Sequence, residues 1–149
     1  MNPNIGAKAI NKEIQEKIRG TKKMITSYVC IDLETTGLNP KMDKIIEIGA
    51  VKVIEGKVVD TLSTYVNPGR KLEERIIELT GIDQEQVDAA PDIAQVLPKL
   101  LDFLGDLPLL GHRVLFDYSF LKKAAVIQKQ AFEKQGIDTL RIARCFLPE

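Results

Sequence analysis

In residues 28–34, Tyr-Val-Cys-Ile-Asp-Leu-Glu, every second residue is strongly apolar. A turn-forming run, Thr35–Pro40, follows. Such a segment is typical of a β-strand, whose side chains point in turn to opposite faces. The strongly apolar members therefore share one face, and Asp32 and Glu34 share the other. A fold for this chain must bury the first face and place the two carboxylates together on the second.

Two more β-rich runs follow at residues 44–57 and 58–68, and Glu55-Gly56 between them predicts a tight turn. The three runs predict an antiparallel meander. Helices are predicted over Leu72–Leu79, Asp92–Leu104, Asp117–Ile127 and Asp138–Phe146, with a short strand over Leu107–Phe116. This order of elements predicts an α/β fold with a mixed sheet flanked by helices.

The N-terminal residues 1–26 form a predicted amphipathic helical extension that carries a surplus of four positive charges, and residues 27–149 form the main domain. The whole chain has a formal net charge of zero, so a nucleic-acid partner would need a local site rather than a general basic field. Cys30 and Cys145 lack zinc-site spacing, and no segment has the length of a membrane span. We therefore expect a reduced, cytoplasmic protein without a membrane partner.

Two carboxylates on one strand face repel each other, and a cation placed between them relieves the repulsion. Oxygen ligands suit hard divalent ions such as Mg²⁺ or Mn²⁺, which activate water and neutralise charge on a phosphodiester. Asp32 and Glu34 are thus candidate metal ligands. A solvent-exposed acidic strand face is the alternative explanation for the spacing alone.

The longer sequence context resembles a known family. The segment Asp32–Gly37 (DLETTG), with the apolar run from Lys44 after it, resembles the first exonuclease motif of the DEDD (DnaQ-like) 3′–5′ exonucleases, and Gly111–Leu121 resembles the second. The tracts Glu78–Asp83 and Asp138–Pro148 are similar to the DNA polymerase III epsilon-subunit type, in the histidine branch of the family. The resemblance implies a ribonuclease H-like fold.

The resemblance also implies catalytic roles. Asp32, Glu34 and Asp117 would converge on two Mg²⁺ or Mn²⁺ ions, with Asp32 bridging both, Glu34 binding the ion that carries the attacking water, and Asp117 approaching the second ion. An ordinary helix N-cap is the alternative role for Asp117, since it stands where the predicted strand passes into a helix.

Substrate contacts are implied for the turn after the first strand. Thr35, Thr36 and Gly37 would offer donors to the 3′-terminal nucleotide, and Leu38 would press on its base; simple turn chemistry is the alternative for Thr35 to Gly37. Further substrate-binding candidates are Thr80, His112 and Phe116. His112 matches the histidine that precedes the second motif, and Arg113 stands where the family usually has Asn.

The third family motif, His-x-Ala-x-x-Asp, does not occur in these 149 residues. We therefore expect a truncated exonuclease with weakened metal binding, impaired activity and a tendency to self-associate through exposed apolar surface. The implied partners are single-stranded DNA 3′ ends, with RNA not distinguished, and DNA polymerase III. The alternative function is a non-catalytic module that binds nucleic acid or a replication partner.

Overall fold

The computed structural model describes residues 25–140 of the chain. Its strands and helices, in chain order, are β1 (Tyr28–Thr35), β2 (Ile45–Ile54), β3 (Lys57–Tyr65), α2 (Glu74–Thr80), α3 (Gln84–Asp88), α4 (Ile93–Leu104), β4 (Leu109–Gly111), α5 (Val114–Ile127) and β5 (Gly136–Asp138). The predicted N-terminal helix, and the part of the predicted last helix beyond Leu140, lie outside the described residues.

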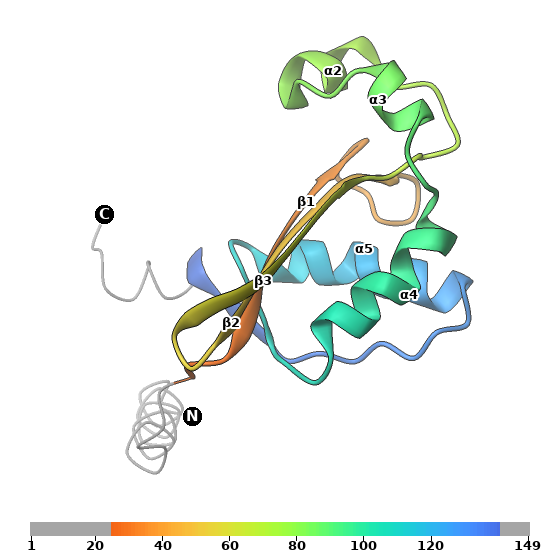
Figure 1. Ribbon diagram of the computed structural model, residues 1–149. Helices are drawn as coiled ribbons and strands as arrows, with labels where there is room; N and C mark the ends of the chain where they lie inside the picture. The colour runs from red at the N-terminus through yellow and green to blue at the C-terminus, as the bar shows by residue number, and fades with distance from the viewer. Residues whose placement is uncertain (1–24, 141–149) are drawn as a thin grey trace, which may run out of the picture.

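The strands form one five-stranded sheet in the order β3-β2-β1-β4-β5 (Figure 1). Strands β1, β2 and β3 pair antiparallel, whereas β4 pairs parallel with both β1 and β5. The predicted meander and mixed sheet are therefore confirmed. The predicted tight turn is confirmed as well. Glu55 and Gly56 both adopt positive φ, at 48° and 78°, as the two central residues of a type I′ hairpin turn do.

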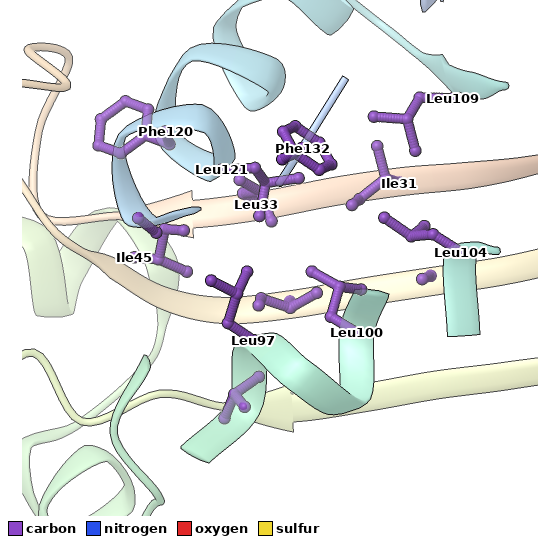
Figure 2. Close-up of a cluster of buried hydrophobic side chains, with 14 of the residues drawn as sticks. Ile31, Leu33, Ile45, Leu97, Leu100, Leu104, Leu109, Phe120, Leu121 and Phe132 are labelled. Atoms are coloured by element: carbon purple, nitrogen blue, oxygen red, sulfur yellow. The ribbon is translucent and has the colours of Figure 1, made fainter. Parts of the chain in front are cut away.

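The main core lies between one face of the sheet and helices α4 and α5. Figure 2 shows Leu104 of α4 near Ile31 of β1, Leu97 of the same helix toward Ile45 of β2, and Leu121 of α5 beside Leu33 of β1. Each large apolar side chain buried in this way contributes roughly 1.5–3 kcal/mol to folding. The predicted alternation of β1 is confirmed, since its strongly apolar side chains are buried while Asp32 is exposed and Glu34 is only half-buried.

Helix ends follow local hydrogen bonding. Asp92 caps α4 by accepting from the backbone N–H of Gln95, whose side chain bonds back to Asp92, so the predicted N-cap is confirmed. Helix α2 begins two residues later than predicted and ends at Gly81, with φ 73°. Helix α3 was not predicted, because its five residues are too few to show a helical period.

The prediction of a strand through Phe116 is wrong. Strand β4 ends at Gly111, and α5 begins at Val114 after Arg113, which has a left-handed φ of 57°. Consecutive apolar residues such as Val114-Leu-Phe are compatible with a strand or a buried helix, so their pattern could not separate the two. Asp117 therefore lies inside the first turn of α5 and is not its N-cap.

The end of the described chain differs from the prediction too. Gly136–Asp138 forms β5, which was not predicted, and helix begins at Thr139, one residue later than the predicted start at Asp138. A three-residue strand carries no periodicity of its own and exists here because β4 offers a parallel partner. No helix within residues 25–140 has the length and apolar character of a membrane span.

Candidate active site

The two β1 carboxylates lie on the face of the sheet opposite the main core. In the antiparallel register Asp32 stands opposite Gly49, and Glu34 stands opposite Glu47. Gly49 has no side chain to cover the Asp32 carboxylate, which is exposed. Burial, followed by the negative charges of Asp32 and Glu47, raises the pKa of Glu34. The strand thus presents a crowded acidic surface, as its sequence predicted.

Asp117 reaches the same region from the first turn of α5. Its side chain is 4% exposed, and burial raises the pKa of its carboxyl from 3.8 to about 7. The charge of Asp32 is the next cause, a hydrogen bond from the Leu33 backbone opposes the rise, and Glu34 adds to it. The carboxyl of Asp117 therefore senses both β1 carboxylates, which links the two predicted motifs in space.

Two further acids belong to this surface and were not predicted as site residues. Glu47 stands beside Glu34, and Asp138 at the end of β5 also raises the pKa of Asp117. The register of β2 against β1 would have pointed to Glu47, since a residue opposite a candidate ligand shares its face. Below, "the acidic cluster" means Asp32, Glu34, Glu47, Asp117 and Asp138.

Asp138 also holds the start of α5. Its Oδ1 accepts hydrogen bonds from the backbone N–H of Arg113, at 3.1 Å, and of Leu140, at 2.9 Å. The first of these contacts fixes the left-handed residue from which α5 departs. Asp117 lies one helical turn after Arg113. Its position therefore depends on β5, the strand that was not predicted from the sequence.

The donor chemistry of the acidic cluster suits a hard divalent cation. All its donors are carboxylate oxygens. The pKa values of Glu34 and Asp117 are raised first by burial and then by the neighbouring negative charges, and a bound cation would offset both effects. The described residues do not include a group of three or more His, Cys, Asp or Glu side chains already arranged to hold a metal ion. The carboxylates are thus coupled electrostatically, but their side chains are not preset as a metal cage.

The turn after β1 already uses its hydroxyl groups as donors. Thr35 Oγ1 donates to the carbonyl of Gly37 at 2.6 Å, and Thr36 Oγ1 donates to Asp43 Oδ1 at 3.2 Å. The Thr36 backbone N–H donates to the carbonyl of Lys44. These contacts support turn chemistry for both hydroxyls, and their predicted contact with substrate stays a prediction.

Gly37 and Leu38 occupy the tip of this turn. A Cβ atom added at Gly37 would lie 2.4 Å from Asp43 Oδ2, so a larger residue could not fit without moving that carboxylate. Leu38 is 83% exposed and free of the core, as a residue that presses on a substrate base would have to be. Asp43 was not predicted as a site residue.

The remaining substrate-binding candidates lie in three different settings. Thr80 hydrogen-bonds locally, with the Ile76 carbonyl and the Ile82 N–H, at the end of α2. His112 is exposed after β4, with Nδ1 3.4 Å from Thr139 Oγ1. Phe116 is half-buried against the main core, and its ring centroid lies 4.9 Å from that of Phe120. None of these contacts joins the three residues into one subsite within the described part of the chain.

Comparison with known proteins identifies the family. The family model described as Exonuclease (RNase_T) matches residues 29–149. The DNA polymerase III PolC-type of Clostridium perfringens is 43% identical over 122 residues, covering 82% of this chain, and that of Bacillus subtilis is 39% identical over 125 residues, covering 83%. The chain spans only 8% and 9% of the lengths of these two relatives.

Solved structures are similar to the fold. Exonuclease X in complex with 5′ overhanging duplex DNA superposes with a TM-score of 0.65 at 29% identity, covering 81% of this chain and 64% of that one. Exonuclease I in its apo form gives a TM-score of 0.71 at 17% identity, over 82% of this chain and 31% of that one. The predicted ribonuclease H-like sheet flanked by helices is thereby confirmed.

Proposed function

The chain belongs to the exonuclease family, and we propose that residues 27–149 form a 3′–5′ exonuclease domain of the DNA-proofreading type. The observation that carries the proposal is electrostatic. Asp117 lies in α5, 85 residues further along the chain than Asp32 of β1. Its pKa is raised first by burial and then by the negative charges of Asp32 and Glu34. A buried acid whose pKa is raised both by burial and by specific charged neighbours from another element is typical of catalytic centres.

We assign Asp32, Glu34 and Asp117 as the carboxylates that would hold divalent cations, Mg²⁺ or Mn²⁺. Bound there, such ions supply activation of water and neutralisation of charge on the phosphodiester. The chain's own contribution is to keep three mutually repelling carboxylates on one surface. Strand β1 fixes the first two, and the helix start held by Asp138 fixes the third.

The substrate that fits this assignment is a single-stranded DNA 3′ end. The structural relative Exonuclease X, at 29% identity, is described in complex with 5′ overhanging duplex DNA, and the PolC-type relatives are DNA polymerases. This context supports association with a DNA polymerase III. It favours the PolC type over a separate epsilon subunit as the nearer counterpart, because the sequence relatives carry the PolC-type name.

The 149-residue polypeptide on its own should be a weak enzyme. These 149 residues contain no His-x-Ala-x-x-Asp pattern. They therefore do not include the carboxylate and the histidine base that the third motif supplies in the histidine branch of the family. General-base catalysis alone is typically worth 10²- to 10⁴-fold in rate. Large apolar side chains such as Leu79 and Leu115 are 80% and 73% exposed, which supports the prediction that the polypeptide self-associates.

A non-catalytic binding module is the second candidate. The observation that favours it is the absence, within residues 25–140, of a side-chain group already set to hold a metal. The two functions differ in what they require of Asp32. A module that binds nucleic acid or a replication partner has no need of that carboxylate, whereas the exonuclease does.

The test of the proposed function is mononucleotide release from 3′-labelled single-stranded DNA in the presence of Mn²⁺. We expect slow release by the 149-residue chain, and a further fall of at least about tenfold in Asp32→Ala, since a metal ligand is lost. Asp60→Ala is the matched control, because Asp60 is an exposed strand aspartate on β3 outside the acidic cluster. Equal rates for wild type and Asp32→Ala would favour the module.

A further inference from the structure

The turn that follows β1 is organised by one carboxylate, that of Asp43. Its Oδ1 accepts from the hydroxyl of Thr36 at 3.2 Å, and its Oδ2 accepts from the backbone N–H of Asn39 at 2.9 Å. The backbone N–H of Asp43 in turn donates to the Asn39 carbonyl at 2.7 Å. Both carboxylate oxygens are thus committed to the loop that contains Gly37 and Leu38.

The close fit at Gly37 follows from this arrangement. A Cβ at Gly37 would lie within 2.7 Å of all three carboxylate atoms of Asp43. The carboxylate cannot simply rotate away, because that would break its bonds to Thr36 and Asn39. The turn backbone therefore packs directly on the Asp43 side chain.

The large apolar side chains of the loop, Leu38 and Met42, are 83% and 67% exposed, so they add little packing to its support. A cavity of about 270 Å³ lies beside it, with Asp43, Lys44, Phe120 and Lys123 among its lining residues. The candidate ligands Asp32, Glu34 and Asp117 do not line this cavity. Polar contacts must then hold the loop in place where packing does not.

Two cations complete the support. Lys123 of α5 donates to the carbonyl of Lys41 at 2.5 Å, and Arg70 donates to the carbonyl of Met42 at 2.9 Å. Because α5 also carries Asp117, Lys123 ties the loop to the helix that delivers the third candidate ligand. A hydrogen bond therefore connects the turn to α5, the helix that carries Asp117 of the acidic cluster.

We propose that Asp43 is a positioning residue for the 3′-terminal nucleotide. Its carboxylate holds the Gly37–Leu38 turn that follows β1, so that the exposed Leu38 side chain is kept at a fixed place just after Asp32 and Glu34 in the chain. We assign Asp43 to positioning and not to metal binding, since each of its oxygens already accepts a hydrogen bond from the loop. This inference rests on the proposed function, which supplies the nucleotide that the turn would receive.

The test separates placement of the 3′ terminus from binding of the strand as a whole. A single-stranded oligonucleotide with 2-aminopurine at its 3′ end, a non-hydrolysable last linkage and fluorescein at its 5′ end is titrated with the 149-residue chain in Mn²⁺. Anisotropy of the fluorescein reports overall binding, and 2-aminopurine fluorescence reports whether the last base is unstacked in the turn. Wild type is expected to change both signals.

Asp43→Ala removes two hydrogen bonds and should lower the 2-aminopurine change roughly tenfold or more, while overall affinity stays within about twofold. Thr36→Val, a near-isosteric change, removes the bond to Asp43 together with the bond that the Thr36 hydroxyl accepts from the Lys44 N–H at 3.0 Å, and should lower the 2-aminopurine change about fivefold. Asp43→Asn keeps one acceptor and the side-chain volume, so it should restore much of the signal. Asp60→Ala is the control and should match wild type.

The possible outcomes are distinct. If Asp43→Ala and Thr36→Val place the 3′ base as wild type does, the positioning role is overturned while the exonuclease proposal stands. If circular dichroism shows that Asp43→Ala does not fold, Thr36→Val decides alone by the same criterion. If wild type shows no anisotropy change, both the nucleic-acid function and the role of Asp43 are overturned.

Discussion

A chimera that extends Glu149 with a segment carrying the His-x-Ala-x-x-Asp motif is expected to release mononucleotides roughly 10²- to 10⁴-fold faster than the 149-residue chain. The segment can be taken from an exonuclease of the histidine branch, the branch of the family to which this motif belongs. It would supply the base and the carboxylate that these 149 residues lack. Initial rates on 3′-labelled single-stranded DNA in Mn²⁺ give the comparison.

The control for that gain is the same chimera with Asp32→Ala. Its rate should return to the level of the unextended chain, because the added motif needs the β1 carboxylate as its partner at the metal site. Activity that survives in the substituted chimera would mean that the added segment works without Asp32. Rapid release by the unextended chain would contradict the account of its impairment.

Asp117→Asn is expected to stabilise the metal-free protein at pH 8. The folded-state pKa of Asp117 is about 7 against an ordinary 3.8, so ionising this acid costs the folded protein free energy that it does not cost the unfolded chain. Stability from this group is therefore full below about pH 4, falls as the pH rises toward 7, and stays low above it. The total is at most about 4 kcal/mol, at 1.36 kcal/mol for each pKa unit.

Asparagine keeps an acceptor for the Leu33 backbone hydrogen bond but has no charge. Urea denaturation in EDTA at pH 4.5 and pH 8 measures the effect, which should be small at the lower pH and a few kcal/mol at the higher one. Asp102→Asn, at an exposed position on α4, is the matched control. A variant that loses stability at pH 8 would show that the Asp117 carboxylate is not under electrostatic strain.

The elements that could be predicted from the sequence are those whose signal lies within a few neighbouring residues. Alternation in β1 located Asp32 and Glu34 on one face, and the capping pattern at Asp92 located the start of α4. The hairpin turn at Glu55-Gly56 followed from its residue types. In each case the information lies within a few neighbouring residues.

The features that sequence could not predict depend on contacts between distant segments. Strand β5 exists only as a partner of β4, and through it Asp138 reaches both Arg113 and the surroundings of Asp117. The burial of Asp117 and its pKa follow from packing that no local pattern records. The role of Asp43 was hidden for the same reason, since its partner Thr36 lies seven residues away across a loop.

If Asp32, Glu34 and Asp117 act as one divalent-cation site, Mn²⁺ must stabilise the folded protein, and thermal unfolding with and without Mn²⁺ measures this. At a Mn²⁺ concentration 100 times the Kd, binding to the folded state adds about 2.7 kcal/mol, which raises the Tm by several degrees. We predict this rise in wild type and in Asp60→Ala, and none in Asp32→Ala. An equal rise in Asp32→Ala, or no rise in wild type, would contradict the claim.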